Sequence, residues 1–189
     1  MAYATVAELK ERVGISDVVD DAVLGAVLEA VSAGIDNYCD RRFDQVEEAR
    51  TFSPRRVDRV LIDDCVSVSE VATDDGSRSY ARVWAASDYD LTPENAAPRE
   101  PYTVLAISPL GNYTLPILRK GVRVTGVWGW PSVPEPVHEA CLIQAARVFK
   151  RKDSPFGITG TPEYGQMRLG RFDPDVAWLL EPYRKIAVG

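Results

Sequence analysis

The sequence predicts an α+β protein: a helical bundle of about four helices, interrupted by a small antiparallel β-sheet subdomain, with a long loop before the C-terminal helix. Three observations predict this class. Apolar residues recur at three- and four-residue steps near both ends of the chain, short β-branched runs fill the middle, and a glycine-rich stretch precedes the last helix. We expect one domain, comprising N-terminal helices (1–43), the inserted β subdomain (44–130) and C-terminal helices with their loop (131–189).

Two helices are predicted before the sheet. Thr5 and Glu8 form a capping box, in which each side chain binds a backbone amide that the helix leaves unpaired. With Gly14 as a C-terminal cap, they predict a short helix over about Val6–Val13. A longer helix from roughly Val19 to Tyr38 follows, and its apolar residues share one face: Leu24, Val27, Leu28, Val31, Ile35 and Tyr38.

The middle of the chain predicts a small antiparallel sheet. Asp74-Asp75-Gly76 supplies a tight hairpin turn, in which the glycine takes a positive φ. Prolines between Pro93 and Pro116 restrict that stretch to loops or edge strands, because proline has no amide hydrogen to donate. The predicted strands are Val57–Ile62, Val66–Thr73, Tyr80–Trp84, Tyr89–Thr92, Thr103–Ile107 and Gly121–Trp128.

Two more helices are predicted after the sheet. Pro134-Glu135-Pro136 begins the first, where a missing proline N–H costs little because that amide would be unpaired anyway. The stretch Asp153–Phe172 is rich in glycine and proline without apolar periodicity, which indicates a long loop, either functional or mobile. Asp173-Pro174 then caps a last helix from Asp175 to about Lys185, in which Pro182 would cause a kink or begin a separate turn.

Composition excludes several classes of protein. Apolar residues make up 46% of the chain and charged residues 26%, values that exclude a disordered chain, a collagen-like repeat and a disulfide-stabilised miniprotein. No stretch approaches about 18 consecutive apolar residues. The first ten residues also lack a basic region followed by an apolar run, so we expect neither a membrane span nor a secretory signal.

The net charge of −6 is unevenly distributed. Residues 1–94 contain 10 Lys and Arg against 20 Asp and Glu, a net charge of −10, whereas residues 95–189 contain 12 against 8, a net charge of +4. The acidic half would repel nucleic acid, because cations that neutralise phosphates supply affinity for the backbone. The basic half suits an acidic surface, including the acidic half of a neighbouring copy. Ordinary solvated surface is the alternative interpretation.

The sequence offers little for metal binding. His138 is the only histidine, and it lies one helical turn from Cys141, a spacing at which two side chains can share a ligand. A zinc site would need two more ligands, and Leu142 breaks the HExxH pattern, so a packed helix start is the other interpretation. Cys39 and Cys65 complete an odd number of distant cysteines, which we expect to be reduced thiols of a cytosolic protein.

Catalytic motifs are missing as well. Two pairs of adjacent carboxylates, Asp63-Asp64 and Asp74-Asp75, are candidates for catalysis. Neighbouring residues of a strand point to opposite faces, so the two carboxylates of a pair would not act together. The frequent occurrence of aspartate in turns explains both pairs. A serine or cysteine nucleophile would need a positioned base, for which His138 is the only imidazole. The sequence contains neither a GxSxG element nor a phosphate-binding loop. We therefore predict no catalytic residue, no cofactor and no metal.

Two aromatic stretches allow a structural or an interface interpretation. Trp128-Gly129-Trp130-Pro131 ends a predicted strand, and it is either a packed hinge between sheet and helix or a subunit contact. The last helix carries aromatic and cationic residue types that are enriched at interfaces, and we leave core and interface open for them: Trp178, Tyr183, Arg184 and Lys185.

Several stretches in this order resemble one known family. They are Tyr3-Ala4-Thr5 before Glu8-Leu9-Lys10, Asp36-Asn37-Tyr38-Cys39-Asp40-Arg41-Arg42-Phe43, Asp88-Tyr89-Asp90-Leu91, Val124-Thr125-Gly126-Val127-Trp128-Gly129-Trp130-Pro131, and Asp173-Pro174-Asp175 with Leu180-Glu181-Pro182-Tyr183-Arg184. Over nearly the whole chain they resemble the head–tail connector (adaptor) proteins of long-tailed bacteriophages.

The resemblance implies a structural virion protein. Such proteins are mostly helical, form a ring of twelve copies that binds the portal protein, and present a docking platform for a head-closure or tail-side neck protein. Double-stranded DNA passes through the ring's channel without sequence-specific binding, and no cofactor, catalytic residue or membrane is involved. The location implied is the virion neck, after assembly in the bacterial host cytoplasm. The long sheet insertion departs from the shortest family members.

The candidate contact region for portal or neighbouring subunit is Asp153–Tyr183, with the loop as the assembly segment. The residues we select are Phe156, Tyr164, Arg168, Arg171, Phe172, Trp178, Tyr183, Arg184 and Lys185. Three alternatives stay open: another neck component, such as a head-closure or tail-completion protein dominated by β structure; a non-viral regulatory or nucleic-acid-binding module; and an enzyme that uses His138.

Overall fold

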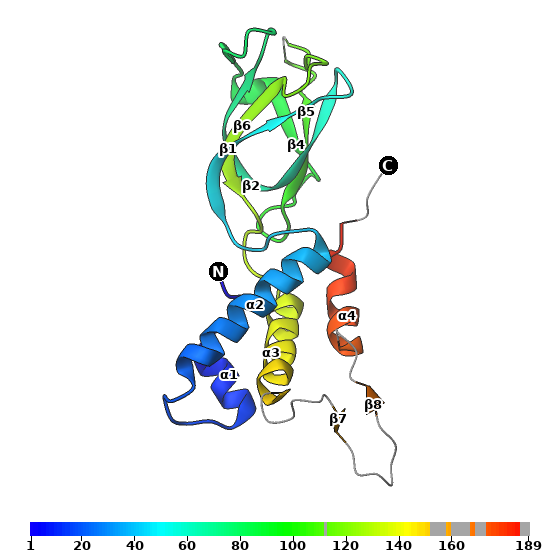
Figure 1. Cartoon of the computed structure of the whole chain (residues 1–189). Coiled ribbons are helices and arrows are strands. Elements are labelled where there is room, and N and C mark those ends of the chain that lie inside the picture. The colour runs from blue at the N-terminus through cyan, green and yellow to red at the C-terminus, as the bar shows by residue number, and fades with distance from the viewer. Residues whose placement is uncertain (112, 152–157, 160–166, 169–172, 186–189) are drawn as a thin grey trace. The chain divides into compact units, whose positions relative to one another are not determined.

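The chain divides into two compact units. A computed structural model describes residues 1–111, 113–151, 158–159, 167–168 and 173–185 (Figure 1). The helical unit comprises Met1–Arg41 and Val133–Gly189, and the sheet unit comprises Arg42–Ser132. Among the described residues, four α-helices and a six-stranded antiparallel sheet confirm the predicted α+β class.

The first two helices depend on local capping. Helix α1 covers Val6–Val13, and the predicted capping box is present, with Thr5 N donating to Glu8 Oε2 at 2.7 Å. Gly14 ends α1 in the left-handed region, at φ 78°. Helix α2, Asp21–Cys39, starts later than predicted, because the Asp17 side chain accepts a hydrogen bond from Val19 N at 3.0 Å and directs the backbone into a turn.

Helix α3, Glu135–Lys150, connects these two helices to the last one. It contacts α1, α2 and α4, Pro174–Leu180. The prediction that the last helix continues to about Lys185 is wrong. A 3₁₀ turn, Glu181–Tyr183, follows α4, as the alternative interpretation of Pro182 predicted. The core of the helical unit includes Leu9, Leu24, Leu28, Ile35, Val137, Cys141, Val176 and Leu180.

The stretch predicted as a loop contains regular structure. Strands β7, Ile158–Thr159, and β8, Met167–Arg168, pair antiparallel. Residues 152–157, 160–166 and 169–172 lie outside the described residues, so most of the Asp153–Phe172 prediction falls there.

The strand order of the sheet is β1-β6-β2-β5-β4, with β3 paired to β2. Strand β1 was not predicted, because its sequence, VEEARTF, is mostly polar and its side chains are largely exposed. It forms because its whole length pairs with β6. The strands are β1 Val46–Phe52, β2 Arg59–Thr73, β3 Arg82–Val83, β4 Tyr89–Thr92, β5 Tyr102–Ile107 and β6 Val122–Trp128.

Strand β2 corrects the prediction of two separate strands, Val57–Ile62 and Val66–Thr73. It runs without interruption, and its register shifts between Leu61 and Cys65, where it changes partner from β5 to β6. Such irregularities bend a strand and re-aim its side chains. Asp63 and Asp64 occupy this shift; Asp64 is buried, whereas Asp63 is partly exposed and pairs with Arg50 at 3.0 Å.

A second apolar core lies in the sheet unit. Side chains of β6 alternate between buried and half-buried positions, as predicted from its sequence. Trp128 is completely buried, and its ring lies 5.5 Å from that of Phe52. The buried cluster consists of Val60, Ile62, Cys65, Val71, Trp84, Leu105, Leu115, Val122, Val124 and Trp128.

Candidate interaction surfaces

Helix α4 carries one highly exposed tryptophan, Trp178. Asp173 caps the helix by accepting from Asp175 N at 3.0 Å, and Arg147 of α3 donates to the other oxygen of the same carboxylate. Val176 and Leu180 are buried. This orientation leaves Trp178 76% exposed, which favours the interface interpretation over the core for that residue.

Trp178 borders a groove in the helical unit. The groove has a volume of about 470 Å³ and is lined by Pro136, Trp178, Leu179, Glu181, Pro182 and Tyr183. Most of this lining is aromatic, aliphatic or proline. Tyr183 is half-buried. An aromatic side chain beside an apolar groove is the kind of feature that anchors protein contacts.

The rim of the groove is fixed to α2. The Arg184 guanidinium lies 5.2 Å from the centre of the Tyr38 ring and donates to both oxygens of Glu181, at 3.1 and 3.2 Å. Lys185 N donates to Cys39 O at 2.8 Å. Burial, followed by the charge of Glu181, raises the pKa of Tyr38, while hydrogen bonding to Glu181 raises the pKa of Arg184. We call this surface, from Trp178 to Lys185, the α4 surface.

The structure brings four of the nine predicted contact residues together. Trp178, Tyr183, Arg184 and Lys185 all lie on the α4 surface. The backbone of Arg168 belongs to β8, and its side chain is not described. The other four lie outside the described residues: Phe156, Tyr164, Arg171 and Phe172.

The groups considered for metal or nucleophilic chemistry have other partners. His138 Nε2 lies 3.3 Å from Glu8 Oε1, and Cys141 Sγ lies 3.5 Å from Ser32 Oγ. Cys39, Cys65 and Cys141 are free and buried. Burial raises the pKa of Cys39 and Cys65 to about 11, and it also raises that of Cys141. The thiolate is therefore disfavoured at neutral pH.

The part of the chain that the structure describes contains no group of three or more His, Cys, Asp or Glu arranged to hold a metal ion. Within the same residues, no helix combines the length and apolar character needed to cross a membrane.

Sequence analysis missed a cationic surface in the sheet unit. Arg78 and Tyr80 follow the turn after β2, and Arg119 and Lys120 precede β6. These segments are about 40 residues apart in the chain, but they line one hollow together. The sequence does show arginine, tyrosine and lysine in turns near strand ends. No local pattern, however, indicates that the two segments meet in the folded protein.

Comparisons with known proteins identify the fold. No protein-family model and no curated protein sequence matches the chain. Among solved structures, a chain in the neck of an empty GTA particle, computed with C6 symmetry, matches at 20% identity and a TM-score of 0.58, covering 97% of this chain and 90% of that one. This chain therefore shares its fold with a chain of the GTA neck.

Two further structures agree with this match. A chain in the neck of a native GTA particle, computed with C12 symmetry, matches at 20% identity and a TM-score of 0.57, covering 97% of this chain and 89% of that one. A chain in the virion of a native gene transfer agent (GTA) particle matches at 22% identity and a TM-score of 0.57, covering 97% and 90%. The shared fold therefore includes both the helical and the sheet unit.

Proposed function

We propose that this protein is a structural component of the neck of a tailed phage or phage-like particle, where it serves as the head–tail connector. In that role it forms a ring of twelve copies, binds the portal, extends the DNA channel and presents a platform for the next neck or tail protein. The observation that carries the proposal is the fold that 97% of this chain shares with chains of GTA necks.

Ring assembly is supported by the symmetry of the similar structures. Their necks were computed with C6 and C12 symmetry, which places identical copies around one axis. A closed ring of this kind needs two different complementary surfaces on each copy. The uneven charge distribution, −10 in residues 1–94 and +4 in residues 95–189, is consistent with such a pair of surfaces.

The α4 surface is the proposed contact with the portal or with a neighbouring copy. Trp178 is exposed beside an apolar groove, and the Glu181–Arg184–Tyr38 contacts hold the rim in place, so less conformational freedom is lost on binding. We assign Phe156, Tyr164, Arg168, Arg171 and Phe172 to the same contact region. Tryptophan, tyrosine and arginine supply most of the strong contacts at protein interfaces.

A structural role also fits the chemistry of the chain. All three thiols are buried with raised pKa, and the single histidine lies against Glu8. An acidic first half would let double-stranded DNA slide through a channel, because it offers few cations to hold phosphates. We therefore propose a non-catalytic protein of the virion neck that binds no cofactor.

Cryo-electron microscopy of purified particles, with a small label fused to this chain, tests the proposal. The expected result is twelve labelled copies in a ring directly beneath the portal. Absence of the label from the neck would refute the proposed function. The map would also show whether Trp178 contacts the portal or a neighbouring copy.

A second neck role has one observation in its favour. The sheet unit spans Arg42–Ser132, and β structure is what we expect to dominate head-closure and tail-completion proteins. The same map separates the two roles. A connector contacts the portal, whereas a head-closure or tail-completion protein lies further toward the tail.

A further inference from the structure

One end of the sheet unit carries a group of cations. Strand β1 ends there and β6 begins there, because Phe52 pairs with Val122. A hollow of about 520 Å³ at this end is lined by Thr51, Arg78, Tyr80, Arg119 and Lys120. With Arg82 from the adjoining β3, these residues form what we call the basic end: Arg78, Arg82, Arg119 and Lys120.

The backbone around this hollow is firmly held. The Tyr80 hydroxyl donates to Lys120 O at 2.7 Å, and Lys120 N donates to Ser53 Oγ at 2.8 Å. Arg78 N donates to Asp74 Oδ1 at 2.6 Å. Arg78, Tyr80 and Lys120 all adopt a positive φ, of 66°, 50° and 56°. Residues other than glycine rarely adopt a positive φ. Where they do, the surrounding contacts must hold the backbone in that conformation.

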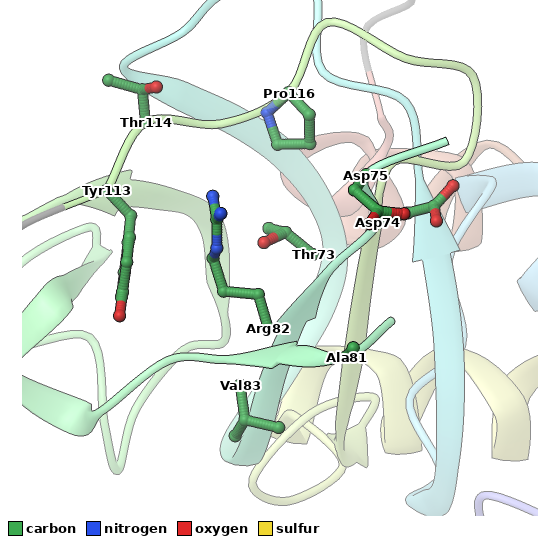
Figure 2. A pocket seen from close by; sticks show the side chains of 9 residues that line it. All are labelled: Thr73, Asp74, Asp75, Ala81, Arg82, Val83, Tyr113, Thr114 and Pro116. Carbon is green, nitrogen blue, oxygen red and sulfur yellow. The ribbon is translucent and has the colours of Figure 1, made fainter. Parts of the chain in front are cut away.

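A second hollow is lined by residues on both sides of the Arg78–Tyr80 segment. It has a volume of about 460 Å³ and is lined by Thr73, Asp74, Asp75, Ala81, Arg82, Val83, Tyr113, Thr114 and Pro116. Figure 2 shows the Arg82 side chain reaching into it between Tyr113 and Thr73, and its guanidinium lies 5.2 Å from the centre of the Tyr113 ring. Val83 is 55% exposed, so this hollow offers apolar surface beside the cation.

The cations of the basic end are paired less closely with carboxylates than most other cations of the sheet unit. Elsewhere in the sheet unit, carboxylates pair with cations at 2.7 to 3.1 Å, as they do with Arg42, Arg50, Arg56, Arg59 and Arg123. Over the residues that the structure describes, Arg82, Arg119 and Lys120 form no ion pair, and Arg78 reaches Asp74 only at 4.0 Å. Asp74 and Asp75 line the same hollow as Arg82, whereas Arg119 and Lys120 have no such carboxylate beside them among the described residues. Cations held this loosely can accept an external anion.

We infer that the basic end binds an acidic polypeptide segment, which also carries apolar side chains, from another protein of the particle. This inference rests on the proposed neck function. Arginine holds a carboxylate through two parallel hydrogen bonds, and the apolar surface of Val83 and Pro116 accommodates neighbouring apolar side chains. The fixed backbone reduces the conformational freedom lost on binding.

DNA fits this surface less well. Binding along DNA uses many cations that follow the phosphate backbone, whereas these four surround two hollows. The sheet unit contains 11 Lys and Arg against 13 Asp and Glu, a net charge of −2, so its attraction for anions is confined to the basic end. A DNA duplex extends beyond that end, whereas a short acidic segment does not. The Arg123 guanidinium lies 4.9 Å from the centre of the Tyr80 ring and covers one of its faces, which leaves less of the ring for stacking with a base.

A peptide titration of the full-length protein tests the chemistry. The probe is a fluorescein-labelled 12-residue peptide of alternating glutamate and leucine, with a peptide of alternating glutamine and leucine and a 20-base-pair DNA duplex as comparisons. We expect the glutamate peptide to bind, and the variant Arg119→Gln/Lys120→Gln to bind it about tenfold more weakly. The matched control is Arg42→Gln/Arg99→Gln, which removes the same charge from residues that line neither hollow and should bind like the original protein.

Three results of the titration would overturn the inference. The first is equal binding of the glutamate and glutamine peptides, and the second is equal binding by the original protein and the Arg119→Gln/Lys120→Gln variant. The third is tighter binding of the DNA duplex than of the glutamate peptide, which would assign the surface to nucleic acid. Circular dichroism of both double variants shows that a change in affinity is not loss of folding.

Cross-linking in purified particles identifies the partner. Lys120 is the only lysine in the sheet unit, so a carbodiimide, which joins an amine directly to a carboxylate, reports on the basic end when mass spectrometry finds Lys120 in the product. We expect Lys120 joined to Asp or Glu of a different protein. A link to a second copy of this chain would replace the inferred partner with a self-contact. If the proposed neck function is wrong, the chain will be absent from the neck. The peptide titration measures binding to the basic end independently of that result.

Discussion

The indole Nε1 of Trp130 donates to Asp64 Oδ2 across 3.2 Å, joining the corner after β6 to the register shift of β2. Gln45 adds two bonds from the preceding segment, from its Nε2 to the carbonyl oxygens of Trp130 and Pro131, at 3.0 and 2.9 Å. The Trp130 ring also lies 5.5 Å from that of Phe43. The segments that enter and leave the sheet unit are therefore held side by side.

Removing the indole donor should weaken this corner. Trp130→Phe keeps an aromatic ring beside Phe43 but removes one donor to Asp64, which is 4% exposed. A buried acceptor that loses a donor costs about 1 to 3 kcal/mol, so we expect the free energy of unfolding to fall by that amount. Urea denaturation followed by circular dichroism measures it. An unchanged midpoint would show that the bond contributes nothing.

Gly129 allows the two segments at the same corner to approach. Its φ is 110°, and a Cβ atom there would lie 2.0 Å from Asp44 O. Gly129→Ala should therefore destabilise the protein by about 3 kcal/mol or more, since the backbone must move as well as adopt a disfavoured conformation.

Gly34 provides the matched control for that substitution. It lies within α2, and a Cβ atom there would meet nothing within 4 Å. Gly34→Ala should stabilise the protein by about 0.5 to 1 kcal/mol, because alanine has the higher helix propensity. Thermal unfolding compares the two variants, and equal shifts for both would contradict the steric argument.

The capping box of α1 predicts a pH dependence. Hydrogen bonds from Thr5 are the main reason that the pKa of Glu8 falls from 4.5 to about 2, and His138 adds to the effect. A carboxyl whose pKa is lower in the folded state stabilises that state fully above its unfolded pKa. The contribution is lost as the pH falls from about 4.5 toward about 2. The stability difference between the original protein and Glu8→Gln should shrink over this range.

Urea denaturation at a series of pH values between 2 and 7 measures this difference. Glu11→Gln, which changes an exposed carboxylate on the same helix, serves as the control and should follow the original protein. If the loss of stability caused by Glu8→Gln stays constant from pH 7 to pH 2, the charge of the capping carboxylate is not the cause of that loss.

Trp178 should matter for assembly and not for folding. Because the side chain is 76% exposed, Trp178→Ala should change the free energy of unfolding by less than about 0.5 kcal/mol. If the α4 surface is a contact, ring formation or portal binding should weaken about thirtyfold or more, the effect of losing a strong interface residue. Sedimentation of the protein mixed with portal measures this.

Val19→Ala is the control for Trp178→Ala. Val19 is another exposed apolar residue of the helical unit, and it does not line the groove. We expect this variant to assemble normally. Normal assembly of Trp178→Ala as well would remove the α4 surface from the proposed contacts.

The sequence by itself determined the elements that depend on neighbouring residues. Thr5, Glu8 and Gly14 form the caps of α1 where they were predicted, because a cap uses atoms within four residues of one another. The alternation of β6 was also readable, since it reflects one buried face. The order of several such stretches indicated the resemblance to head–tail connector proteins, and the structural comparisons find the same fold in chains of GTA necks.

Only the tertiary structure decided the features that depend on distant partners. The polar strand β1 forms by pairing with β6, and β2 stays continuous because it exchanges one partner strand for another at Asp63-Asp64. The exposure of Trp178 follows from the burial of Val176 and Leu180. The basic end joins Arg78 to Arg119 and Lys120 across about 40 residues. Pairing and burial depend on what the rest of the chain brings alongside, so local periodicity does not determine them.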